Sequence, residues 1–109
     1  MNAATRKALE GSIRKWRRIV AVRGVDLGTE NCPLCDRFLD GGTHDCKGCP
    51  VRKATGQPEC RGTPYYDFLR VATFIAHGSV AYTSEARKAA QVELDFLISL
   101  RPKTAKRAP

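Results

Sequence analysis

Apolar residues recur every three or four positions at several places in the chain, which is typical of amphipathic helices. The first such stripe predicts a helix over residues 5–23. Gly24 follows it and is a typical C-terminal cap. Gly11 lies inside the stripe, although glycine lowers helix propensity. The apolar positions of this stripe are Leu9, Ile13, Trp16 and Val20.

Two later stripes predict helices over 63–77 and 84–101. Thr63-Pro64 opens the first, because a threonine side chain accepts a hydrogen bond from a free amide and proline has no amide to satisfy. Ser84-Glu85 opens the second with a cap and an acidic first turn. The expected buried positions are Tyr65, Phe68, Leu69, Ala72, Ile75 and Ala76 in the first helix, and Ala89, Ala90, Val92, Leu94, Phe96, Leu97 and Leu100 in the second.

Residues 26–62 show no helical period and are dense in glycine and proline, which indicates turns. Asp40-Gly41 favours a tight reversal, and with Arg37-Phe38 before it predicts a short β-hairpin. We therefore expect a mainly α fold, a single domain over 1–101 followed by a disordered basic tail over 102–109. Three helices would pack around Trp16, Phe68 and Phe96, with the segment 26–62 as a loop containing little β-structure.

This loop-rich segment carries all five cysteines of the chain. Two Cys-x-x-Cys pairs, separated by ten residues, supply the four thiolates that tetrahedral zinc prefers. The simplest ligand set is Cys32, Cys35, Cys46 and Cys49. Cys60 is an alternative ligand, and His44 is a further candidate. An iron–sulfur cluster and a redox dithiol are the alternatives to structural zinc.

The net charge of +8 is concentrated at the two ends of the chain. Residues 1–25 carry seven bases and one acid, residues 26–100 carry eight bases and ten acids, and residues 101–109 carry four bases. Clustered positive charge favours a nucleic acid or an acidic protein as partner, the alternative being a solvated helix face. The side chains expected to contact phosphates are Arg14, Lys15, Arg17 and Arg18.

The chain resembles a group of small cysteine-rich, zinc-knuckle proteins that tailed bacteriophages and prophages encode and that have no assigned function. The likeness spans about half of the chain. It implies a phage origin and a metal site, carries over no catalytic residue, and favours Cys60 as part of the shared pattern. The matching segments are Ala8-Leu9-Glu10-Gly11-Ser12-Ile13 with Trp16, Asn31-Cys32-Pro33-Leu34-Cys35, Cys49-Pro50-Val51, and Cys60 ahead of Thr63-Pro64-Tyr65.

These observations predict a small zinc-binding protein that acts by binding nucleic acid and not as an enzyme. A module that binds a host protein, as an inhibitor or in an anti-defence role, is the first alternative. A metal-dependent nuclease is the second, although a closed set of four thiolates leaves no position for an activated water. No run of 18 apolar residues occurs and the first residues lack a secretory signal, so we expect no membrane span and a cytoplasmic location, that of the host if phage-encoded.

Overall fold

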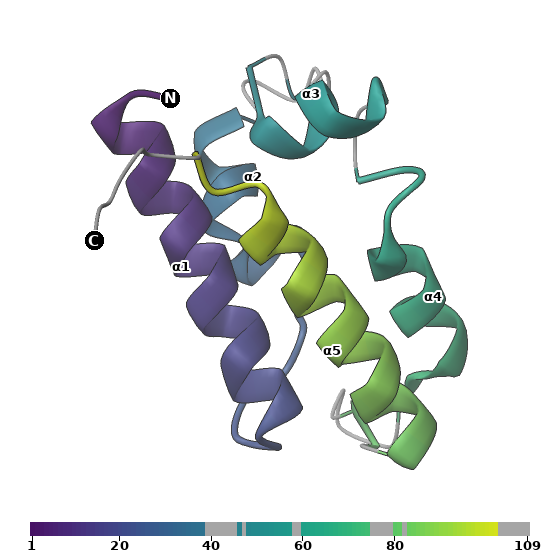
Figure 1. Cartoon of the computed structure of the whole chain (residues 1–109). Helices are drawn as coiled ribbons and strands as arrows, with labels where there is room; N and C mark the ends of the chain where they lie inside the picture. Colours follow the sequence, from purple (N-terminus) through teal and green to yellow (C-terminus); the bar gives the residue numbers. More distant parts are fainter. Residues whose placement is uncertain (39–45, 47, 58–59, 75–79, 82, 103–109) are drawn as a thin grey trace, which may run out of the picture.

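The computed structural model describes residues 1–38, 46, 48–57, 60–74, 80–81 and 83–102, and it is mainly helical, as the sequence predicts (Figure 1). Strands β1 and β2 are two residues each and pair antiparallel, so the expectation of little β-structure is also confirmed. In chain order the elements are α1 (Ala3–Val20), the 3-10 helix η1 (Gly28–Asn31), α2 (Pro33–Phe38), α3 (Pro50–Thr55), α4 (Pro64–Val71), β1 (Thr73–Phe74), β2 (Val80–Ala81) and α5 (Ser84–Ser99).

Helix α1 ends three residues before the predicted boundary at 23. The amide of Val22 donates to the carbonyl of Ile19 at 2.9 Å, and the amide of Arg23 donates to the carbonyl of Arg18 at 2.8 Å. This pair of bonds is a Schellman motif, in which the turning residue adopts a left-handed conformation. Val22 occupies that position with φ of 60°, so the glycine at position 24 is not the residue that ends the helix.

Helix α4 begins as predicted and ends early. The Thr63 hydroxyl accepts a hydrogen bond from the Tyr65 amide at 3.2 Å, which caps the first turn. The helix ends at Val71, not at 77, because Ala72 is extended and leads the chain into β1. Residues 75–79 lie outside the described residues. Helix α5 is capped by Thr83, whose hydroxyl accepts from the amide of its third residue at 3.0 Å.

The segment 26–62 contains more helix than its sequence pattern predicts. The short helices α2 and α3 each begin at a proline, Pro33 and Pro50, where the missing amide costs no hydrogen bond. Arg37 and Phe38 belong to α2, so the predicted entry into a β-hairpin at these residues is wrong. The rest of that predicted hairpin falls at 39–45, outside the described residues.

The core forms where α5 packs against α1 on one side and α4 on the other (Figure 1). The Trp16 ring lies edge-on to Phe68, with their centroids 5.0 Å apart, and both side chains are buried as predicted. Phe96 is partly buried and packs against this cluster. The other buried apolar residues are Leu9, Ile13, Ile19, Leu34, Cys46, Cys49, Val51, Ala86, Ala90, Leu94 and Leu97.

One predicted core residue of α5 is on the surface. Val92 is 53% exposed, whereas the next residue, Glu93, is 4% exposed. The buried stripe of α5 runs through Ala90, Glu93 and Leu97 at helical spacing, and Val92 is two positions from Ala90 and therefore turned away. The apolar character of Val92 misled the sequence prediction, because the buried position beside it is a carboxylic acid.

Helix α2 packs closely on α1 at Gly11. A β-carbon at this glycine would lie 3.0 Å from Cγ of Pro33, so any larger residue would push the two helices slightly apart. The unfavourable helix propensity of Gly11 is thus tolerated for packing, and it brings the first cysteine pair against α1. None of the helices in the described ranges is long and apolar enough to cross a membrane.

Candidate metal centre and basic groove

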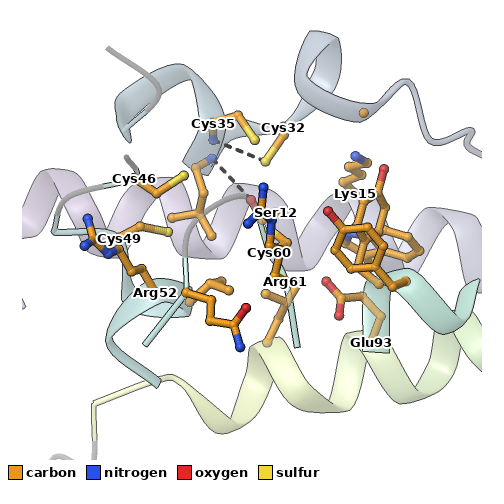
Figure 2. Close-up of a pocket in the computed structure, with 18 residues that line it drawn as sticks. Ser12, Lys15, Cys32, Cys35, Cys46, Cys49, Arg52, Cys60, Arg61 and Glu93 are labelled. Carbon is orange, nitrogen blue, oxygen red and sulfur yellow. Dashed lines mark hydrogen bonds between the residues drawn. The ribbon is translucent and has the colours of Figure 1, made fainter. Parts of the chain in front are cut away.

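All five cysteines line one cavity of about 300 Å³ (Figure 2). Cys32 and Cys35 stand at the start of α2, Cys46 and Cys49 precede α3, and Cys60 precedes α4. Helices α1 and α5 close the cavity with buried side chains, among them Ser12, Trp16 and Leu97. Segments that are distant in the sequence therefore direct their thiols into one space.

The first cysteine pair has the local geometry of a thiolate site. The amide of Cys35 donates to the sulfur of Cys32 at 3.2 Å, a bond of the kind that orients sulfur ligands. The Cys35 thiol also donates to Cys32, and this bond lowers the pKa of Cys32 to about 6 despite burial, with the nearby Lys15 ammonium adding to the effect. The same interaction raises the pKa of Cys35. Of this pair, Cys32 is therefore the thiol that ionises first.

Two other cysteines sit in a strained backbone conformation. Cys46 has φ of 56° and Cys60 has φ of 60°, in the left-handed region that residues other than glycine rarely adopt. The amide of Cys49 donates to the carbonyl of Cys46 at 2.9 Å, which closes the second pair into a tight turn. Burial raises the pKa of Cys49 and raises that of Cys60 to about 12. Strain of this kind, at two residues that line the same cavity, is typical of functional sites.

The thiols are donors of the kind that zinc prefers and they line one cavity, but they are not drawn together into ligand geometry. Within the part of the chain that the structure describes, no three His, Cys, Asp or Glu side chains are close enough to hold a metal ion. The cysteines nevertheless influence one another, because charge on Cys32 and Cys46 raises the pKa of Cys35, Cys49 and Cys60. His44 lies outside the described residues.

Figure 2 shows that Cys46 and Cys49 direct their sulfurs toward the side of the cavity that carries Cys32 and Cys35. The set of four predicted ligands thus faces one space, and Cys60 lines the same space. An ion in this cavity would have Cys32, Cys35, Cys46 and Cys49 around it, with Cys60 as the alternative ligand.

A network of polar side chains that sequence reasoning missed lies beside the cavity. Asp26 is 3% exposed and accepts hydrogen bonds from the Lys15 ammonium at 2.7 Å and from the Tyr65 hydroxyl at 2.8 Å. The amide of Gly28 also donates to Asp26, at 3.0 Å. Burial, with the charge of Asp26, raises the pKa of Tyr65. No motif in the sequence singles out Asp26, which comes from a loop and meets its partners only in the folded chain.

The four cations predicted to bind phosphate divide into two groups. Lys15 lines both the groove and the cysteine cavity, but its side chain is 10% exposed and its ammonium is 2.7 Å from Asp26. Arg14, Arg17 and Arg18 are exposed and line a groove of about 610 Å³ on the outer side of α1. Among the described residues no carboxylate pairs with any of these three arginines.

The far wall of this groove is the loop that follows α1, and Asn31 holds it in shape. The Asn31 amide group donates to the carbonyl of Val25 at 2.8 Å, and its oxygen accepts from the amide of Leu27 at 2.9 Å. Asn31 and Val25 both line the groove. The basic groove, as this surface is called below, is therefore a shaped surface and not only a charged helix face.

No protein family, curated protein or solved structure matches the chain. The chemistry of the cavity and of the basic groove is therefore argued from their geometry.

Proposed function

We propose that this protein is a small zinc-binding module that binds nucleic acid through the basic groove and acts by binding, not by catalysis. The observation that carries the proposal is the row of three exposed arginines, Arg14, Arg17 and Arg18, along one groove with no carboxylate partner among the described residues. Guanidinium groups match phosphate oxygens in planar, two-bond contacts, so an arginine groove suits a phosphate backbone.

Zinc would have a structural role in this proposal. Cys32, Cys35, Cys46 and Cys49 would hold it, with Cys60 as the alternative ligand, and the lowered pKa of Cys32 favours the thiolate that metal binding requires. When bound, the ion links the start of α2 to the start of α3, two segments with little apolar core of their own. Four thiolates complete a tetrahedral shell, which leaves no site for an activated water and disfavours the nuclease alternative.

Lys15 is not part of this proposed interface, because its ammonium is buried and paired with Asp26. The interface is therefore smaller than the sequence predicts on α1, with three arginines instead of four cations. Residues 103–109 add three bases after α5 and lie outside the described residues. They remain a proposed second contact with the phosphates.

The test compares two triple variants that remove the same charge. Arg14→Gln, Arg17→Gln and Arg18→Gln together remove the arginines of the basic groove, whereas Lys53→Gln, Arg70→Gln and Lys88→Gln remove three exposed cations from other helices. Binding to a labelled DNA duplex and to a labelled single strand is measured by fluorescence anisotropy over a series of salt concentrations.

The groove variant should bind far more weakly than wild type, and the log–log slope of affinity against salt should fall by about 0.9 for each phosphate contact that is lost on a duplex. The control variant should keep most of the affinity and slope of the wild type. Equal losses in the two variants, or a wild-type affinity that does not change with salt, would contradict the proposal.

A further inference from the structure

The cavity that holds the thiols also contains a buried carboxyl group, from Glu93 of α5. This residue is 4% exposed, and its Oε1 atom has no hydrogen-bond partner in the part of the chain that the structure describes. Buried polar atoms are nearly always hydrogen-bonded in native proteins, so an oxygen without a partner that faces a cavity points to a missing ligand.

The surroundings of Glu93 disfavour its ionised form, because burial and the charges of Cys32 and Asp26 outweigh the effect of Lys15. Lys15 is the cation whose charge favours the ionised form of Glu93, and its ammonium is already 2.7 Å from Asp26 and lies over the Trp16 ring at 5.4 Å from its centroid; Arg52 and Arg61 also line the cavity. Figure 2 shows the Glu93 carboxyl turned toward the cavity, with Lys15 across from it and the sulfurs of Cys46 and Cys49 on the opposite side of the view. The cavity therefore has a sulfur end and a carboxyl end.

Apolar and aromatic side chains form the walls of the carboxyl end. Tyr65 lies at this end, because its backbone is hydrogen-bonded to the Glu93 carboxyl, and Trp16 is next to Tyr65. Leu97 and the partly exposed Tyr66 also line the cavity. The Trp16 and Tyr65 rings meet edge-on, with their centroids 5.8 Å apart. Aromatic rings attract cations, and apolar walls of this kind accept a small hydrocarbon body.

We propose that the carboxyl end of the cavity binds a small organic cation, an ammonium group on an apolar body, with Glu93 as its ionic partner. The ammonium supplies the donor that Oε1 lacks, and the rings of Trp16 and Tyr65 pack against the body of the ligand. The whole cavity, sulfur end included, measures about 300 Å³, so the carboxyl end takes a ligand no larger than roughly one aromatic ring. This site goes beyond the proposed nucleic-acid function and uses none of the arginines of the basic groove.

The electrostatics of Glu93 agree with this assignment. Burial raises its pKa to about 8, because an ionised carboxylate without a partner is costly away from water. A bound ammonium stabilises the ionised form and brings the pKa back down. A neutral ligand of the same shape offers no such stabilisation, so the site discriminates between ligands by charge.

The experiment titrates the protein, as purified under reducing conditions, with three probes of the same size: benzylammonium, benzyl alcohol and benzoate. Binding is followed by NMR chemical shifts in the wild type, in Glu93→Gln and in the control Glu85→Gln, which neutralises an exposed glutamate of the same helix. Wild type and the control should bind benzylammonium at least tenfold more tightly than benzyl alcohol. Glu93→Gln should lose at least tenfold in affinity for benzylammonium and bind the two probes alike.

The proposal is overturned if benzylammonium does not bind, if benzyl alcohol or benzoate binds as tightly to the wild type, or if Glu93→Gln keeps the affinity. Circular dichroism checks that the variant is folded. Should it fail to fold, the comparison of the three probes on the wild type decides alone. The variant that lacks Arg14, Arg17 and Arg18 should bind benzylammonium like the wild type, so failure of this site and failure of the nucleic-acid proposal are distinguishable.

Discussion

Replacing Glu93 with glutamine should stabilise the protein at neutral pH and leave it almost unchanged in acid. The two side chains have nearly the same shape, and glutamine carries no charge. In the folded chain burial raises the pKa of Glu93 from its ordinary 4.5 to about 8. Between these two values the unfolded chain is ionised and the folded chain holds a proton. Folding therefore takes up a proton, and stability falls as the pH rises through this window.

The size of the effect follows from the two pKa values. Each pH unit inside the window removes about 1.4 kcal/mol of stability. Between pH 4.5 and pH 7 the loss is on the order of 3 kcal/mol for the wild type, and Glu93→Gln avoids it. This is a large share of the stability of a small domain, which is typically about 5–15 kcal/mol. Below pH 4.5 both forms of the protein are neutral at this position, so the difference disappears.

Urea unfolding, followed by circular dichroism at pH 4.5, 6 and 7 on wild type and Glu93→Gln, measures the difference directly. Glu85→Gln serves as the control, because Glu85 is exposed on the same helix. Wild type and variant carry the same cysteines, so the difference in stability between them at one pH does not include the titration of the thiols. A gain of equal size at every pH would mean that the pKa of Glu93 is the same in the folded and unfolded chains, and a variant less stable at pH 7 would mean that Glu93 is ionised and paired; either result would refute the reasoning.

Four further substitutions test the fold. Val22→Gly should raise the unfolding free energy by about 0.5–1 kcal/mol, because glycine adopts the left-handed turn without strain, and a loss in a urea titration would contradict the Schellman motif. Arg101→Gln removes the paired bonds of 2.8 and 2.7 Å to Glu10 and should cost about 0.5 kcal/mol at neutral pH. Arg101 lowers the pKa of Glu10, so this loss should vanish as the pH falls through that pKa; a loss that persists in acid would exclude the ion pair as its cause. Phe68→Ala should cost about 3–5 kcal/mol and Val92→Ala less than about 0.5, and similar costs would contradict the burial assigned to these residues in α5 and α4.

The long helices were predictable because their apolar residues repeat at a fixed period. Leu9, Ile13 and Trp16 predicted the buried face of α1, and Thr63-Pro64 predicted the start of α4 to the residue. The ends of the helices were less predictable, since each depends on contacts beyond the helix. Val22 adopts the left-handed conformation that is usual for glycine. Helix α4 ends where the chain enters β1, which pairs with β2.

The gathering of the thiols was predictable, and the residues around them were not; the ligand set itself stays a prediction. Cysteine spacing alone indicated which thiols would share one space, and all five line one cavity. Asp26 and Glu93 could not be found in this way, because a buried carboxylate has no sequence signature and Val92 beside Glu93 is the better hydrophobic candidate. Lys15 was assigned to the phosphate contacts by its charge, while its burial depends on a partner eleven residues away.

Metal content after purification under reducing conditions is the measurement that tests the central claim most directly. Mass spectrometry of the wild type should find one zinc ion per chain. Four of the five single Cys→Ser variants should lose it and the fifth should keep it, which would decide between Cys60 and a member of the two pairs. Removal of the ion by a chelator should unfold the segment around α2 and α3. A protein that is metal-free, folded and unchanged in its unfolding curve by chelator would contradict the account.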